Sequence, residues 1–221
     1  MQGRHFRLST RRRTAHLGDH GESPRLAAAQ GAWICFQDEA GQVMRPPVAK
    51  TWARRGHTPV IEVSGKGSGR VSIAGLVCLK PGQRGRLMWR TRLHRGRTGE
   101  RGSFSEDDYI AFLDQTHQRL QAPIVLIWDN LNTHVSRRMH ALIATRPWLT
   151  VIRLPAYAPD LNPTEGVWRW MKRGLTNTAA RGVDHLAQLV KRRLRACQQQ
   201  TDLLAGFFAS TGMTLEPEPP R

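Results

Sequence analysis

The order of the short apolar runs constrains the fold of this chain more than any other feature of its sequence. Runs with strand composition come first, at 32–36, 60–63 and 71–79, and a further strand is predicted around Trp89 and Leu93. The second half alternates helices with strands, at 105–120 (helix), 124–128 (strand), 136–145 (helix), 150–154 (strand), and from 164 and over 183–199 (helices). This order predicts an α/β fold with a mixed sheet: an antiparallel meander whose first strand is joined by parallel strands, with helices on the faces. It does not match a doubly wound sheet.

Length and composition indicate one folded domain with tails. The chain has 221 residues, of which 39% are hydrophobic, so it can bury a sizeable core. The segment 1–30 is rich in Arg and lacks apolar periodicity, which predicts a basic, irregular N-terminal arm, either solvated or gripping phosphate. We expect the folded domain over 31–205 and a flexible, proline-rich C-terminal tail over 206–221.

The charge is strongly basic and carried mainly by arginine. The formal net charge is +17, and only five of the 34 basic residues are Lys. Since the planar guanidinium grips pairs of phosphate oxygens, this composition suits a polyphosphate partner better than a small acidic substrate. Between Arg84 and Arg101, seven Arg stand against one acidic residue. A solvated face and a nucleic-acid contact both remain open for this segment.

Cysteines and hydropathy favour an intracellular protein. Cys35, Cys78 and Cys197 form no C-x-x-C pair and lie in apolar or helical runs, which is typical of buried thiols in a reducing compartment. No apolar stretch is long enough to span a membrane. The basic N-terminus lacks the apolar core of a secretory signal.

Three acidic residues are the candidates for chemistry. Asp38 and Asp129 each follow an apolar strand, and Glu165 is in the first turn of a predicted helix. If the strands are neighbours and the helix packs beside them, three carboxylates meet and repel, and a divalent ion relieves the repulsion. Carboxylate oxygens favour magnesium or manganese over zinc. Taken singly, an Asp at the end of a strand is more often a turn residue than a metal ligand, and Glu165 is explained as a complement to the helix dipole.

Four segments together resemble the catalytic domain of DDE transposases, in the insertion-sequence branch related to mariner elements. The resemblance covers about residues 31–200 and rests on segments that include Asp38-Glu39, 51–59 (TWARRGHTP), 128–134 (WDNLNTH) and 154–165 (LPAYAPDLNPTE). The last segment, Pro-x-Tyr-x-Pro-x-Leu-Asn-Pro-x-Glu, is the most specific. The 35 residues between Asp129 and Glu165 are close to the short second spacing of that branch.

The resemblance implies a ribonuclease-H-like fold, a mixed five-stranded sheet flanked by helices, with Asp38, Asp129 and Glu165 as catalytic, metal-binding residues. Two Mg²⁺ ions, or Mn²⁺ as a substitute, would clamp the scissile phosphate for nicking at an element end and then for strand transfer into target DNA. Glu39 neighbours Asp38 in the chain and would face the other side of its strand, so the metal is assigned to Asp38.

Further residues are candidates for supporting the site or contacting DNA. Asn130, Asn132 and His134 follow Asp129, and turn or cap chemistry explains them equally well. The remaining candidates are Asn162, Arg54, Arg55, Arg169 and Lys172.

The resemblance also implies partners and an alternative function. Double-stranded DNA, as transposon ends and target, is the expected partner, with a homo-oligomer on DNA and a cytoplasmic, nucleoid-associated location in a prokaryote. Helix-turn-helix regions normally precede this catalytic domain, and here only about 30 irregular residues precede the first strand. We therefore expect DNA binding through phosphates with little sequence preference. The alternative is a truncated, non-catalytic DNA-binding remnant.

Overall fold

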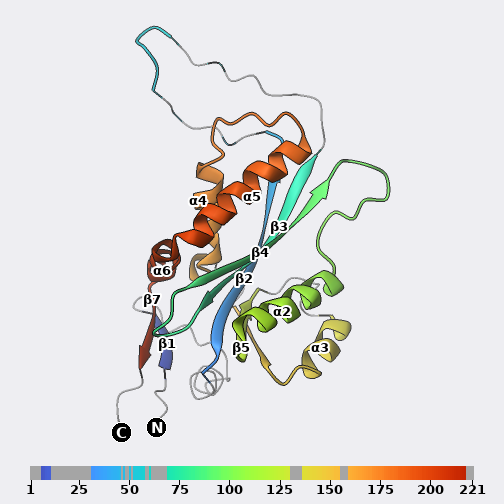
Figure 1. Ribbon diagram of the computed structural model, residues 1–221, viewed down its shortest axis with the longest axis vertical. Helices are drawn as coiled ribbons and strands as arrows, with labels where there is room; N and C mark the ends of the chain where they lie inside the picture. Colours follow the sequence, from blue (N-terminus) through green and yellow to red (C-terminus); the bar gives the residue numbers. More distant parts are fainter. Residues whose placement is uncertain are drawn as a thin grey trace.

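The protein is built around a mixed five-stranded sheet (Figure 1). The computed structural model describes residues 6–10, 31–45, 47, 50, 52–57, 60, 69–129, 136–154 and 159–217. The strands of this sheet are β2 (Trp33–Val43), β3 (Arg70–Leu79), β4 (Arg86–His94), β5 (Ile124–Trp128) and β6 (Leu149–Arg153). Their order is β4-β3-β2-β5-β6. Strands β2, β3 and β4 pair antiparallel, whereas β5 pairs parallel to both β2 and β6, which confirms the predicted meander joined by parallel strands.

Helices cover both faces of this sheet (Figure 1). On one face lie α4 (Thr164–Arg173), α5 (Val183–Gln199) and α6 (Thr201–Ser210), and on the other lie α2 (Glu106–Leu120) and α3 (Arg137–Ala144). Each face has its own apolar core, because alternate residues of a strand point to opposite sides. In β2, Ile34 and Phe36 join the core under α4 to α6, whereas Trp33 and Cys35 join the core under α2 and α3.

Local sequence signals explain where several elements begin. Helix α2 starts after Ser105, whose hydroxyl accepts a hydrogen bond from the Asp108 backbone N–H at 3.3 Å, while the Asp108 carboxylate accepts one from the Ser105 backbone N–H at 2.8 Å. This reciprocal capping box stabilises the first turn of the helix. The predicted bounds of β5 and α5 agree with the structure.

Strand β2 is longer than its apolar segment predicts. The sequence indicates an end at Gln37-Asp38-Glu39, but β2 continues to Val43, and Asp38 lies in its middle, paired with Gly75 of β3. The prediction of a strand end at Asp38 is wrong because β3 supplies backbone hydrogen bonds along this whole stretch, which keeps polar residues in the strand. The neighbouring strand β5 is shorter, and its pairing with β2 ends at Phe36, two residues before Asp38.

The two ends of the described chain form a separate pair of strands. Strand β1 (Phe6–Thr10) pairs antiparallel with β7 (Met213–Pro217). Secondary structure is therefore present both within the arm 1–30 and within the tail 206–221, where the sequence predicts irregular chain. Met213 and Phe208 are buried against the core under α4 to α6, which explains how the segment after α5 is held.

Two sequence predictions concern residues that the structure largely does not describe. The strand predicted at 60–63 and the hairpin turn predicted at 65–69 lie almost wholly outside the described residues. The described part of the chain contains no helix with the length and apolar character needed to cross a membrane.

Candidate functional site

The register of the sheet places Asp38 beside Asp129. Strands β2 and β5 pair in parallel with a constant offset that ends at Phe36 opposite Ile127. The same offset continued by two residues aligns Asp38 with Asp129, and adjacent strands lie about 4.8 Å apart. Phe36 and Ile127 both face α4 to α6. Alternation along the strands therefore assigns Asp38 and Asp129 to that same face.

Helix α4 brings Glu165 to this face. Its first turn is tied to β2 by two buried side chains: the Thr164 hydroxyl donates to the Phe36 carbonyl at 2.8 Å, and Asn162 Nδ2 donates to the Gln37 carbonyl at 2.9 Å. Asn162 Oδ1 also accepts from the Thr164 backbone N–H at 3.1 Å, which caps the helix entry. These bonds hold the start of α4, and thus Glu165, against the part of β2 that carries Asp38.

The carboxylate of Asp38 is in an electrostatically unusual position. Its pKa is raised from the ordinary 3.8 to about 7, mainly by burial, next by the negative charge of Glu165, and to a smaller extent by that of Asp129. Hydrogen bonds from the Glu39 backbone N–H and the Trp168 indole oppose this rise in pKa. The three acidic residues are thus close enough to act on one another, although the sequence separates them widely.

The arrangement is not a closed metal-coordination shell. Across the described ranges, no three His, Cys, Asp or Glu side chains lie close enough together to hold a metal ion. The donor chemistry nevertheless fits a hard divalent cation, because the face offers half-buried carboxylates whose mutual repulsion a cation would relieve. Glu165 and Asp129 therefore both act electrostatically on Asp38, but the three carboxylates do not themselves form a metal-coordinating group.

The other candidate residues fall into three groups. Asn130, Asn132 and His134 lie outside the described residues. Arg54 and Arg55 are exposed. The described segment 52–57, which contains them, stands away from the sheet in Figure 1, so the structure does not bring this segment to the carboxylates.

The third group comes from α4 and the turn before it. Arg169 and Lys172 are exposed on α4, four and seven residues after Glu165, which places them on the same side of the helix. Asn162, in contrast, is only 5% exposed and bonds the backbone, so it anchors the turn before α4 and does not present its side chain to DNA.

Trp168 contacts the site but was not among the candidate residues. Its indole Nε1 donates to Asp38 Oδ2 at 3.0 Å. In the sequence Trp168 belongs to the apolar stripe of its helix, together with Val167 and Met171, and such a stripe indicates core packing. The signal that was available is its spacing of three residues from Glu165, which puts both side chains on neighbouring positions of one helix face.

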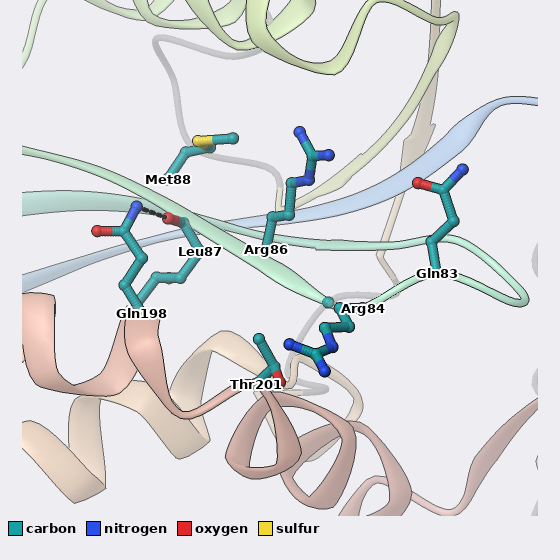
Figure 2. Close-up of a pocket in the computed structure, with 8 residues that line it drawn as sticks. Gln83, Arg84, Arg86, Leu87, Met88, Gln198 and Thr201 are labelled. Atoms are coloured by element: carbon teal, nitrogen blue, oxygen red, sulfur yellow. Dashed lines mark hydrogen bonds between the residues drawn. The ribbon is translucent and has the colours of Figure 1, made fainter.

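A cavity of about 330 Å³ lies elsewhere in the molecule (Figure 2). It is bounded by the start of β4 and the junction of α5 with α6, where Gln198 Nε2 donates to the Leu87 carbonyl at 2.8 Å. Its lining includes Arg84, Arg86 and Thr201, but none of the three acidic candidates. This cavity is therefore separate from the carboxylate face.

Comparisons with known proteins bear on the family and the fold of the chain. A family model described as DDE superfamily endonuclease matches residues 33–189. Similar solved structures include the Mos1 transposase paired-end complex with the left transposon end, with a TM-score of 0.52 and 15% identity over 81% of this chain and 55% of that one. The Mos1 mariner paired-end complex with Mg has a TM-score of 0.53 and 17% identity, over 83% and 56% of the respective chains. The corresponding complex with Mn has a TM-score of 0.51, at 17% identity and with the same coverage.

These comparisons bear on the fold and on the extent of the chain. The structural likeness confirms the ribonuclease-H-like architecture expected from the sequence. The chain spans about 55% of the length of the Mos1 chain in the first of these complexes. No curated protein sequence matches it.

Proposed function

The chain belongs to the DDE superfamily of endonucleases, and on that premise we propose that it is the catalytic domain of a transposase that cleaves DNA strands and transfers them to a target. The observation that supports the proposal is that the charges of Glu165 and Asp129, after burial, raise the pKa of Asp38, since this requires the three residues to lie near one another. Solved complexes of similar fold contain transposon-end DNA and Mg or Mn, which supports DNA as the substrate and these ions as cofactors.

Asp38, Asp129 and Glu165 would hold two Mg²⁺ ions, with Mn²⁺ as a substitute. When bound, such a pair supplies Lewis-acid stabilisation of the attacking and leaving oxygens in an in-line phosphoryl displacement. The chain itself would supply the placement: Asp38 lies in β2, Asp129 directly follows the neighbouring β5, and Glu165 is in the anchored first turn of α4. Half-burial keeps the carboxylates oriented while leaving them open to a phosphodiester.

Arg169 and Lys172 would guide the DNA backbone to the carboxylates. Both are exposed on the side of α4 that carries Glu165, and Arg173 is exposed one residue further on. Guanidinium and ammonium groups at this spacing can contact successive phosphates of one strand, and such contacts do not distinguish one base from another. We therefore infer binding with little sequence preference and a strong dependence on salt. A homo-oligomer on DNA is part of the same proposal, because joining two transposon ends requires two active sites.

A plasmid-nicking assay tests the catalytic proposal. The full chain is incubated with supercoiled plasmid and Mg²⁺ or Mn²⁺, and Asp129→Asn is compared with Asp202→Asn, the same change at an exposed position of α6. We expect nicking that requires metal, is lost in Asp129→Asn by about 100-fold or more, and is unchanged in Asp202→Asn.

Equal nicking by the unmodified chain and Asp129→Asn would contradict the proposed catalytic function. Metal-independent DNA binding without any nicking would instead favour the non-catalytic remnant.

A further inference from the structure

Trp168 makes a polar contact that its place in the core does not require. The side chain is 2% exposed, and its Nε1 donates to Asp38 Oδ2 at 3.0 Å. The other oxygen, Asp38 Oδ1, accepts from the Glu39 backbone N–H at 2.9 Å. Since each carboxylate oxygen thus has one fixed donor, the plane of the Asp38 carboxylate is set, and each oxygen keeps a free lone pair.

Gly75 makes room for this contact. It pairs directly with Asp38 across β2 and β3. A Cβ atom built at Gly75 would lie 2.6 Å from Trp168 Cη2 and 3.0 Å from Cζ2, closer than packed carbon atoms approach. The backbone conformation of Gly75 does not require glycine, so close approach of the indole is the reason for a residue without a side chain here.

The same contact links two of the three acidic residues. Trp168 and Glu165 are one helical turn apart on α4, and Asp38 is on β2. A hydrogen bond from Trp168 to Asp38 therefore sets both the direction of the Asp38 carboxylate and the position of the α4 turn that carries Glu165. A buried indole N–H needs some acceptor, but a backbone carbonyl would satisfy it without linking these two residues.

We propose that Trp168, seated over Gly75, is a positioning residue that aims the Asp38 carboxylate toward the cation-binding face and holds Glu165 beside it. The proposal rests on the function proposed above and adds a residue that acts through Asp38 without contacting DNA or cation itself. Hydrogen-bond partners of metal-binding side chains affect affinity and activity by about 10- to 100-fold.

The test compares Trp168→Phe with Trp170→Phe in the full chain. Trp168→Phe keeps an aromatic ring and removes the N–H donor. Trp170→Phe makes the same change two residues away, where the ring stacks on the Arg193 guanidinium at 3.9 Å. Mn²⁺ binding is followed by electron paramagnetic resonance without DNA, and nicking is followed at saturating DNA over a range of Mn²⁺ concentrations. All variants are measured well below their own midpoint of thermal unfolding.

For Trp168→Phe we expect about tenfold weaker Mn²⁺ binding and an equally raised Mn²⁺ concentration for half-maximal nicking, with the Kd for DNA unchanged. Trp170→Phe should keep the Mn²⁺ affinity of the unmodified chain. Gly75→Ala provides a second variant: it leaves Trp168 intact but displaces the ring, and we expect it to weaken Mn²⁺ binding in the same direction. If Trp168→Phe does not fold, Gly75→Ala decides the outcome.

Two results would overturn the proposal. One is Mn²⁺ binding by Trp168→Phe, or by Gly75→Ala where that variant decides, equal to that of the unmodified chain. The other is an equal loss in Trp170→Phe, which would indicate a general effect of helix packing. Asp38→Asn separates this failure from failure of the proposed function: if Asp38→Asn also retains Mn²⁺ binding and nicking, the metal-dependent function itself is wrong.

Discussion

The two faces of the sheet place a carboxylate in opposite electrostatic surroundings. On the face of α2, Asp108 is surrounded by cationic and N–H groups: its carboxylate accepts from Arg92 at 2.7 and 2.8 Å and from the Ser105 backbone N–H. Partial burial alone would raise its pKa, but the Ser105 and Arg92 interactions outweigh burial and lower it. On the face of α4, burial and then the negative charges of Glu165 and Asp129 raise the pKa of Asp38 to about 7, and hydrogen bonds from two uncharged N–H groups only partly oppose this rise.

The two faces therefore differ in what surrounds their carboxylates: Asp108 has a cationic partner within the chain, whereas the charged neighbours that raise the pKa of Asp38 are themselves acidic. Arg92–Asp108, Arg95–Asp184 and Arg146–Asp114 join distant segments through ion pairs of 2.6 to 2.7 Å. Such pairs are neutralised within the chain and contribute modestly to stability. On the α4 face, in contrast, burial and then the negative charges of Glu165 and Asp129 raise the pKa of Asp38, so like charges are held close together there. The basic segment between Arg84 and Arg101 is thus partly structural, because Arg92 and Arg95 already have acidic partners.

The largest effect is expected from removing the charge of Asp38. The folded state binds a proton at Asp38 more tightly than the unfolded chain does, because its pKa is about 7 against an ordinary 3.8. Stability from this group is therefore fully present at low pH and is lost as pH rises from about 4 to about 7, by at most about 4 kcal/mol. In Asp38→Asn this decline should disappear.

Urea unfolding without metal, at a series of pH values, measures the decline. Asp202→Asn serves as the control, since Asp202 is exposed on α6. If the native chain and Asp38→Asn showed the same pH dependence of the free energy of unfolding, the raised pKa of Asp38 on the α4 face would be contradicted.

A smaller effect on stability is expected at Asp108, and its dependence on pH has the opposite direction to that of Asp38. Asp108→Ala removes the capping box and the ion pair to Arg92, so we expect a loss of about 2 kcal/mol in the free energy of unfolding at neutral pH. Because the pKa of Asp108 is lowered, its contribution is present above the ordinary pKa of Asp and is lost as pH falls through the lowered value.

Asp107→Ala is a matched control for this effect, because Asp107 is in the same helical turn but its ion pair to Arg138 is more exposed. Equal losses of stability in the two variants would show that the helix dipole, and not the buried capping network, is responsible. The Mn²⁺ affinity should be unchanged in both.

The smallest effect is expected from the exposed cations of α4. Replacing Arg169 and Lys172 by Ala removes two phosphate contacts, so the slope of log K for DNA against log salt should fall in magnitude by about 2, with stability unchanged. Fluorescence anisotropy with duplexes of unrelated sequence measures the slope. The pair Arg137→Ala and Arg195→Ala, exposed on α3 and α5, makes an equal change of charge away from Glu165. An equal fall in that pair would show that DNA binding depends on net charge and not on the α4 surface.

Much of the secondary structure is predictable because its causes are local. The capping box at Ser105 and Asp108 and the apolar stripe of 183–199 are interactions between residues a few positions apart, and both helices begin where these signals place them. Strand β5 follows from a short β-branched run that ends at a polar residue.

Other features could not be predicted because they depend on partners distant in the chain. The continuation of β2 past Phe36 requires β3, whose backbone pairs with residues that have no apolar pattern. The pairing of β1 with β7 joins opposite ends of the chain, and neither segment has a local signal strong enough to indicate a strand. The role of Trp168 is hidden for the same reason: a tryptophan in an apolar stripe has the same sequence signature whether or not its N–H meets a carboxylate.

The sequence by itself determined the types of the main elements, their order and the identity of the three acidic candidates, since these follow from periodicity, capping and a motif within short segments. Only the tertiary structure decided that β5 pairs in parallel with the half of β2 that leads to Asp38, and that the start of α4 is hydrogen-bonded to β2 through Asn162 and Thr164. The physical reason is that register and helix docking are set by hydrogen bonds and packing between segments far apart in the chain. The same long-range contacts bury Asp38 and bring the charges of Glu165 and Asp129 near it, which together raise its pKa.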